Sequence, residues 1–382
     1  MNNPFVFGES VPADDPDGLA DREEELALLR RSMAGGRNVI VIAPRRYGKT
    51  SLIKRAVVEA RSAGGRSGWV SLGDCASQKD VAETLLAGVL SGPASWEQRL
   101  HSGVRRRLES LGAAVRLHSG PSDSDVELSV TLRPAEGGWR DTIAEVLRTL
   151  RDAGDDGRPV SFVIDEFQAA HEIDPAIPGV VKRLVDELRG VSLVLSGSKR
   201  HLMEQLTSGG AAPLARIGTM MALPKIPREA MVDFLMRRAT KGGRLLAESV
   251  AGAIYDAADG IPNECQQIAW FAHEASTRRI TLASVTTAVD LLLRQARFEY
   301  EAIWERTSPS GRRLVKALAA DGPLNSLASR AMVDRVEVAN ASSVKAALRA
   351  LERDDLVEHG PDGWRVANPL FALWLRERAG RD

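Results

Sequence analysis

Apolar and polar positions follow a strand pattern and a helix pattern in turn through the first half of the chain. Short apolar runs at 38–42, 160–164, 191–195 and 219–223 are separated by stretches whose apolar residues recur every three or four positions. Alternation of buried strands with amphipathic helices is typical of a parallel α/β sheet. The first half is therefore predicted to be an α/β domain with helices on both faces of one sheet.

After residue 226 the pattern becomes helical. The segments 227–239, 246–259, 262–276 and 281–296 each read as an amphipathic helix. Two of them begin with proline, which is favoured at the first helical position because its missing N–H has no intrahelical partner there. We expect a helical domain, which suits a lid over a ligand site on the preceding sheet.

The last segment has the pattern of a winged helix-turn-helix domain. Three short helices are expected at 308–321, 326–336 and 342–354, followed by a two-stranded wing and a final helix at 369–378. In the third helix Val344, Leu348 and Leu351 share one face. Lys345, Arg349 and Arg353 repeat every four residues on another, which suits contact with DNA phosphates and base edges.

The acidic residues Glu352, Asp354 and Asp355 lie close to this basic stripe. Winged helices also dock proteins, and a basic stripe is also found on merely solvated faces. DNA binding and protein docking both remain open for this domain.

The first predicted strand and helix enclose a loop of known chemistry, "APRRYGKTS". Gly48, Lys49 and Thr50 form the end of a phosphate-binding loop, in which backbone N–H groups and the helix N-terminus favour phosphate oxygens. Lys49 is expected to reach the β and γ phosphates of ATP, and the Thr50 hydroxyl to ligate Mg²⁺. The residues expected to contact the nucleotide are Ala43, Pro44, Arg45, Arg46, Tyr47, Gly48, Lys49, Thr50 and Ser51.

Ala43 stands where this type of loop usually has its first glycine. If the position requires a left-handed backbone, the Cβ costs about 1 kcal/mol or more; if it only ends the strand, it costs almost nothing. The sequence leaves these two cases open.

Polar residues at the ends of two later strands complete the candidate site. Asp165 is expected to hold Mg²⁺ through water and Glu166 to polarise the attacking water, although acids also occur in plain surface turns after core strands. Ser198 is placed to sense the γ-phosphate. Arg216 either reaches the γ-phosphate of a neighbouring subunit or forms a surface salt bridge.

Together, "APRRYGKTSL", "VIDEFQ", "VLSGS" and "PLAR" resemble the archaeal-type ATPase family, which belongs to the AAA+/STAND group of P-loop ATPases related to origin-recognition initiators. The resemblance implies an ATPase core, a helical lid and a C-terminal winged helix. It also implies that Arg22 lies near the adenine, with Asp21 where glycine is usual, and that Pro262 packs near the base.

Two departures from the family pattern bear on the mechanism. Ala43 replaces the first loop glycine, and Asn263 and Glu264 follow Pro262 where many AAA+ proteins carry a lid arginine. Coupling of the lid to hydrolysis is therefore less firmly implied than nucleotide binding.

These patterns predict three domains: an ATPase core at 1–223, a lid at 224–304 and a winged helix at 305–382. An inserted hairpin is expected at about 95–135, preceded by a basic helix with Arg105, Arg106 and Arg107 that either contacts DNA or an acidic partner or is simply solvated.

Composition excludes several function classes. Lys+Arg and Asp+Glu both number 51, so no global charge draws the chain to nucleic acid or acidic lipid. Cys75 and Cys265 suffice for neither a disulfide framework nor a zinc site. Neither a signal peptide nor an apolar run of about 18 residues is evident, so we expect a cytoplasmic protein without a membrane partner.

Three hypotheses follow for function. The first is an ATPase that uses ATP and Mg²⁺ as a conformational switch, with a winged helix that binds DNA. The second is an ATP-regulated signalling or scaffold protein whose winged helix docks protein; assembly as a homo-oligomer or with a protein partner is open in both. The third, a metabolic kinase, explains the phosphate loop but gives the lid and the winged helix no role.

Overall fold

The computed structural model describes most of the chain. The residues outside the description are 1–2, 91–112, 120–125, 133–137, 155–156, 187, 189, 211, 328, 339, 361 and 380–382. The chain forms two compact units, one of Ser10–Pro224 and the other of the residues up to Glu9 together with Lys225–Asp382.

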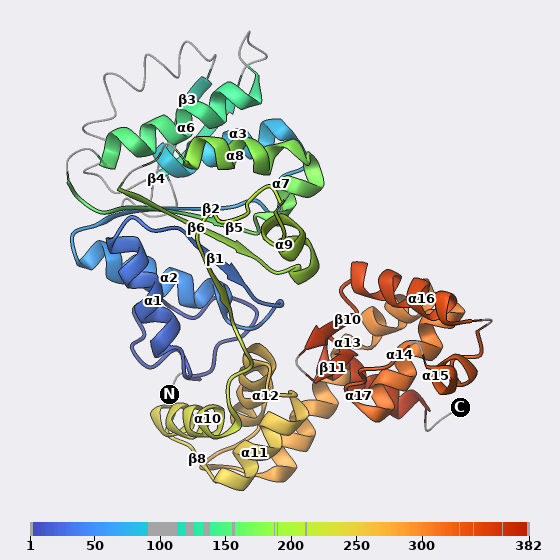
Figure 1. The fold of residues 1–382 in the computed structure, drawn as a ribbon. Helices are drawn as coiled ribbons and strands as arrows, with labels where there is room; N and C mark the ends of the chain where they lie inside the picture. The colour runs from blue at the N-terminus through green and yellow to red at the C-terminus, as the bar shows by residue number, and fades with distance from the viewer. Residues whose placement is uncertain are drawn as a thin grey trace. The chain divides into compact units, whose positions relative to one another are not determined.

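A five-stranded parallel sheet forms the centre of the first unit, with the strand order β2-β5-β6-β1-β7 (Figure 1). Its strands are β1 (Val39–Ile42), β2 (Arg66–Ser71), β5 (Val160–Asp165), β6 (Val191–Gly197) and β7 (Thr219–Ala222). The predicted α/β class is confirmed. Every residue of β1, β5 and β6 is buried, because helices cover both faces of the sheet.

Helices α1 and α2 cover one face of the sheet, and α3, α6 and α8 cover the other (Figure 1). The helices of this unit are α1 (Glu23–Ala34), α2 (Lys49–Ser62), α3 (Gln78–Leu90), α6 (Trp139–Gly154), α7 (Gln168–Ile173), α8 (Ala176–Val185) and α9 (Arg200–Thr207). Phe162 and Phe167 are among the largest fully buried side chains. They anchor the core beside the end of β5, where the candidate acids lie.

A two-stranded hairpin is inserted between α3 and α6. Its strands β3 (Ala113–Ser119) and β4 (Val126–Leu132) pair antiparallel. The basic helix expected around Arg105, Arg106 and Arg107 lies outside the described residues.

Helices dominate the second unit. It contains α10 (Arg228–Lys241), β8 (Leu245–Leu246), α11 (Glu248–Ala257), α12 (Pro262–Glu274), β9 (Arg279–Ile280) and α13 (Leu282–Arg306). Thr281 and Ser284 form a reciprocal capping box at the start of α13. This helix continues to Arg306 without a break, ten residues beyond the segment read as helical from the sequence.

The winged-helix elements follow α13 in the predicted order. They are α14 (Pro309–Asp321), α15 (Arg330–Arg335), α16 (Ala341–Arg353), β10 (Val357–Gly360), β11 (Gly363–Val366) and α17 (Pro369–Ala379). Ser308, Ser329 and Asn340 each accept a backbone N–H and cap the N-termini of α14, α15 and α16. The antiparallel β10–β11 pair forms the wing.

None of the helices within the described residues is long and apolar enough to cross a membrane.

Candidate functional site

The loop between β1 and α2 has the shape of an anion cradle. Gly48 adopts a left-handed backbone with φ of 82°, and no heavy atom lies within 4 Å of the position that a Cβ would occupy. Helix α2 begins at the next residue, so the first N–H groups of the helix have no intrahelical acceptor. An open position beside a helix N-terminus fits phosphate.

Ala43 does not strain this loop. Its backbone does not have a positive φ, and its side chain is buried. Its N–H donates to the Gly197 carbonyl at 3.3 Å. Ala43 therefore extends the hydrogen bonding of β1 to its neighbour β6, so its Cβ costs almost nothing at this position. Of the rest of the loop, Tyr47 is buried, whereas Arg45 and Arg46 are exposed.

Lys49 lies between the two carboxylates expected at the site. Its Nζ is 2.6 Å from Asp165 Oδ1 and 2.9 Å from Glu166 Oε1. Burial raises the pKa of both carboxyls, but the Lys49 ammonium and the hydrogen bonds outweigh burial, so that both pKa values lie below the ordinary ones. Both acids are therefore held ionised beside the phosphate loop.

Asp165 and Thr50 supply adjacent oxygen atoms. The Thr50 hydroxyl donates to Asp165 Oδ2 at 3.0 Å, and the Ser196 hydroxyl donates to Oδ1 at 2.5 Å. A hydroxyl and a carboxylate beside a phosphate cradle fit Mg²⁺, which usually takes one or two protein oxygens and completes its octahedron with phosphate and water. Within the described part of the chain no three acidic, histidine or cysteine side chains are grouped as a metal site.

Glu166 has a backbone conformation that is rare for residues with a side chain, with φ of 52°. Its Oε2 accepts hydrogen bonds from Ser198 Oγ at 2.7 Å and from Gln168 Nε2 at 2.5 Å. Ser198, expected at the site, is thus brought into it. Gln168 and Ser196 were missed by the sequence reading; a serine inside an apolar strand was the one available signal for Ser196.

Residues near the start of the core form hydrogen bonds with the first turn of α2 and with the end of the same unit. Val11 N donates to Ser51 Oγ at 3.0 Å, so this hydroxyl is used within the protein. Arg22 is buried and donates to Glu25 and to the Pro224 carbonyl, while burial lowers its pKa. Asp21 has a left-handed backbone with φ of 46°, a conformation that glycine adopts more easily than other residues.

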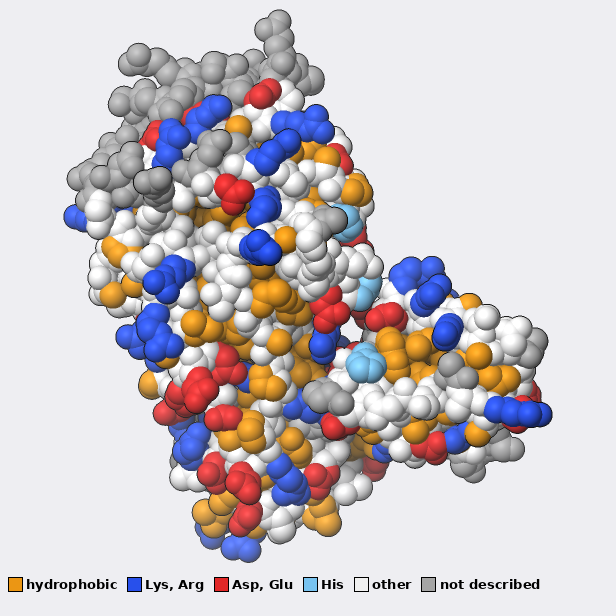
Figure 2. Space-filling view, viewed as in Figure 1, with side chains coloured by type: hydrophobic (Ala, Val, Ile, Leu, Met, Phe, Trp, Pro, Cys, Tyr) orange, Lys and Arg blue, Asp and Glu red, His pale blue; other side chains and the backbone are white. Residues whose placement is uncertain are grey.

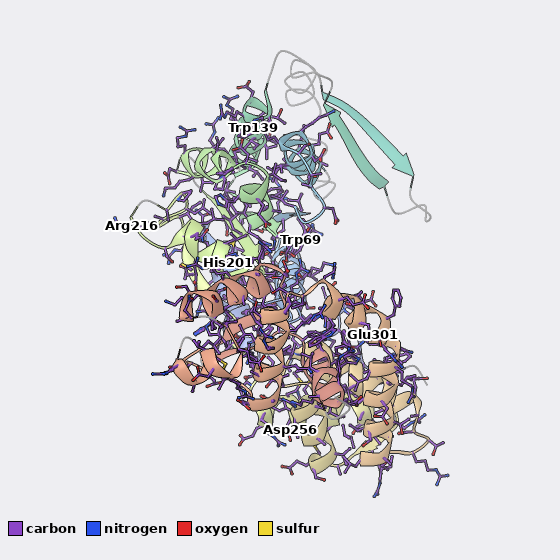
Figure 3. All side chains as sticks on the ribbon, turned by 90° about the vertical axis from the view of Figure 1, so that its right-hand side faces the viewer. Trp69, Trp139, His201, Arg216, Asp256 and Glu301 are labelled. Atoms are coloured by element: carbon purple, nitrogen blue, oxygen red, sulfur yellow. The ribbon has the colours of Figure 1, made fainter. Side chains whose placement is uncertain are left out.

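Arg216 was expected to reach the γ-phosphate of a neighbouring subunit or to form a surface salt bridge. It follows α9 on the loop to β7, has φ of 60°, and its side chain is exposed at the outer edge of the core (Figure 3). A role toward a neighbouring subunit stays a prediction.

Pro262 belongs to the other compact unit. It is the first residue of α12 and follows Gly260, whose left-handed φ of 68° turns the chain into the helix. Its expected position near the base stays a prediction, as does that of Arg22.

The expected DNA-facing stripe is exposed. Lys345, Arg349 and Arg353 lie in solvent on α16, where Figure 2 shows Lys and Arg side chains gathered. Val344 and Leu351 on the opposite face are buried, and Leu348 is half-buried. Arg353 contacts the adjacent Asp354 at 3.3 Å.

The wing differs from α16 in the burial of its basic residue, because Arg365 is buried whereas the cations of the α16 stripe are exposed. Arg365 donates to Glu358 Oε1 at 2.5 and 2.7 Å and lies 3.8 Å from Asp259. Lys225 binds the same Asp259 at 2.8 Å, and burial lowers its pKa. These contacts hold the wing to the helical domain within the same unit.

Comparison with known proteins supports the architecture. Residues 298–377 match the family model described as a probable winged helix domain. No curated protein sequence matches the chain. The winged helix predicted at the end of the chain is thereby confirmed.

Three solved structures are similar over almost the whole chain. The Walker-type ATPase of Pyrococcus abyssi aligns with a TM-score of 0.68 and 17% identity, covering 98% of this chain and 99% of that one. The ORC2 protein of Aeropyrum pernix, in ADPNP–ADP complexes, aligns at 0.57 and 14%, covering 99% and 98%. The ORC1 protein of the same organism, in complex with DNA, aligns at 0.51 and 16%, covering 95% and 94%. The chain therefore has the fold of archaeal ORC-type and Walker-type ATPases, as the motifs predicted.

Proposed function

We propose that the core binds ATP with Mg²⁺ and hydrolyses it as a conformational switch. The observation that carries the proposal is the contact of Lys49 with both Asp165 and Glu166 beside an open phosphate cradle. One cation and two ionised carboxylates at a helix N-terminus form the charge set that phosphoryl chemistry uses.

ATP binding changes the partners of Lys49. The ammonium turns from the carboxylates toward the β and γ phosphates, because these charged groups would lie beside it at the start of α2, while Mg²⁺ would take Asp165 as its own partner. Thr50 and Asp165 would hold Mg²⁺, which when bound neutralises charge on the phosphates. Arg22 and Pro262 are proposed to contact the adenine side.

Hydrolysis requires a carboxylate that is ionised and free to accept a proton. Release of Lys49 leaves Glu166 Oε1 free to polarise water, while Ser198 near its other oxygen is placed to sense the γ-phosphate. The exposed Arg216 suits a contact with the γ-phosphate of a second copy of the chain.

The winged helix is proposed to bind DNA through α16. Its three exposed cations and buried opposite face support this, as does the similarity to a protein solved in complex with DNA. Arg365 is proposed to take no part, since it is buried against Glu358. Docking of a protein by this domain, the alternative reading, is favoured by the acidic residues at the end of α16.

Inorganic phosphate release by the purified protein tests the enzymatic part. Glu166→Gln should lose turnover by at least about 100-fold, since a positioned base contributes about 10²–10⁴ to rate, and should still bind ATP with Mg²⁺. Turnover of this variant at the wild-type rate would remove Glu166 from its role. A phosphorylated acceptor in place of free phosphate would favour the kinase hypothesis.

A further inference from the structure

The two oxygens of Glu166 have different kinds of partner. Oε1 accepts from the Lys49 ammonium at 2.9 Å, a group that the proposed function moves onto phosphate. Oε2 accepts from two neutral donors, Ser198 Oγ at 2.7 Å and Gln168 Nε2 at 2.5 Å. Only the second pair can hold the carboxylate once Lys49 has left it.

Gln168 is buried at the start of α7, two residues after the acid that it contacts. Its Nε2 is also 3.5 Å from Ser198 Oγ, and its Oε1 has no hydrogen-bond partner among the described residues. Exchanging the two amide atoms would place an oxygen against the carboxylate, which is repulsive; the –NH₂ group therefore faces Glu166. Gln168 therefore donates a hydrogen bond to Glu166, while its own carbonyl oxygen accepts none from the described residues.

Gly197 makes room for this amide. A Cβ on Gly197 would lie 2.5 Å from Gln168 Oε1 and 2.5 Å from Met203 Cγ, closer than real Cβ contacts. The φ of Gly197 is not positive, so a Cβ there would act through space, by displacing the Gln168 amide or the Met203 side chain. Two segments that are distant in sequence converge here: the turn from β5 to α7, and the end of β6.

We propose that Gln168 is a positioning residue, which together with Ser198 keeps the Glu166 carboxylate in place for water activation after Lys49 has turned to the nucleotide. The inference rests on the proposed function. It assigns to Gln168 a role in holding the proposed base, separate from the role of Ser198 toward the γ-phosphate.

The charged groups around Glu166 are Lys49 on α2 and Asp165 on β5. Both groups remain when Gln168 is changed. Removing the N–H donor of Gln168 therefore isolates the contribution of this one hydrogen bond to the pKa of Glu166. A carboxylate that loses a hydrogen-bond donor becomes easier to protonate. If Gln168 only filled space in the core, its replacement by a side chain of similar size would leave the pKa of Glu166 unchanged.

The first measurement needs no turnover. The full chain, labelled with ¹³C at glutamate side-chain carboxyls, is titrated without nucleotide, and the Glu166 signal is assigned by its loss in Glu166→Gln. Gln168→Met has similar length and no donor, and we expect its Glu166 to protonate at higher pH than in the wild type. An unchanged titration overturns the proposal, whether or not the protein hydrolyses ATP.

The second measurement is kcat against pH with Mg²⁺ and ATP. In Gln168→Met we expect kcat to fall about tenfold or more, its acid limb to move to higher pH, and the Kd of ATP to stay within about twofold. A fall in kcat with an unmoved acid limb and a lowered thermal midpoint means a structural role only, and overturns the proposal.

Gln78→Met is the matched control. Its amide donates to the Asp174 carboxylate at 2.7 Å in the same compact unit, so the substitution removes the same kind of bond elsewhere. We expect kcat, its acid limb and the Glu166 titration to be unchanged. A wild type without turnover refutes the proposed function, whereas the carboxyl titration still decides on Gln168.

Discussion

Lys49 and the basic stripe of α16 both offer cations to phosphate, in opposite physical settings. Lys49 is buried and lies within 3 Å of two carboxylates, so its position is fixed before any ligand arrives. Lys345, Arg349 and Arg353 are exposed, and Arg353 contacts Asp354, which is exposed as well. Removing one partner of a buried pair costs about 3–5 kcal/mol, whereas an exposed pair contributes about 0–1 kcal/mol.

At the buried site the contacts of each atom therefore indicate its chemical role. At the exposed stripe only the charge of the side chains and the helix face that carries them indicate a role. Four predictions test the contrast, beginning with the largest expected effect.

Lys49→Met should weaken ATP binding by about 100-fold or more, because a charge-assisted hydrogen bond contributes about 1.5–3 kcal/mol and Lys49 is expected to reach two phosphates. Isothermal titration calorimetry with Mg²⁺ measures the change. Lys54→Met is the control, since Lys54 lies on the same helix and donates to Ser10 Oγ at 2.8 Å. Equal losses in the two variants would show that the effect is not specific to the loop.

The pH dependence of stability should reveal the buried pairs. Asp165 and Glu166 have lowered pKa values in the folded state, so their contribution to stability is fully present above the ordinary values of about 4 and is lost as pH falls below them. In Lys49→Met the attraction between the ammonium and the two carboxylates is removed, so both pKa values should lie higher than in the wild type. The gap in unfolding free energy between wild type and variant should therefore narrow on acidification.

Urea unfolding of both proteins between pH 7 and pH 3 measures this gap. A gap that stays constant over the range would mean that the lysine and the carboxylates are not coupled in solution.

Much of this site could be predicted from sequence, because strand ends and the phosphate loop are local patterns. Asp165, Glu166 and Ser198 follow apolar runs directly, and the fold brings them to one edge of the sheet. Gln168 could not be identified in this way. The amide of Gln168 occupies space that Gly197 leaves free at the end of β6. The residues next to Gly197 in the sequence give no indication that it lies beside Gln168 in the fold.

The winged helix shows the same limit. The three helices, the wing and the exposed stripe of α16 follow from periodicity. The burial of Arg365 does not, because it arises from contacts with Glu358 across the wing and with Asp259, about a hundred residues earlier. From the sequence alone, Arg365 looks like any other basic residue on a wing.

Replacing Lys345, Arg349 and Arg353 by alanine should remove DNA binding and leave ATP turnover without DNA unchanged. Removal of each cation that binds a phosphate should lower the slope of log K against log salt by about 0.9, and the free energy of unfolding should change by less than about 0.5 kcal/mol. Fluorescence anisotropy with duplex DNA from low to moderate salt measures the slope.

A triple substitution of Arg294, Arg297 and Arg306 on α13 removes the same charge from exposed positions elsewhere, and its slope should fall less. If the wild type shows no DNA binding at low salt with ATP, with ADP or without nucleotide, protein docking becomes the preferred role of the winged helix.

The smallest effect is expected at Ala43. Its backbone is not left-handed and its N–H continues the bonding of β1, so Ala43→Gly should leave the Kd of ATP within about twofold. The unfolding free energy should fall by about 0.4–1 kcal/mol, since glycine adds freedom to the unfolded chain.

Gly48→Ala is the contrasting change. At a φ of 82° a Cβ is strained by about 1 kcal/mol or more, so this variant should be less stable than the wild type. The Cβ would also enter the space proposed for phosphate, so ATP binding should weaken as well. Calorimetry and thermal unfolding of the two variants separate strain from phosphate contact. A tenfold gain in ATP affinity for Ala43→Gly would show that the methyl group of Ala43, and not only the backbone around Gly48, limits how closely phosphate approaches the loop.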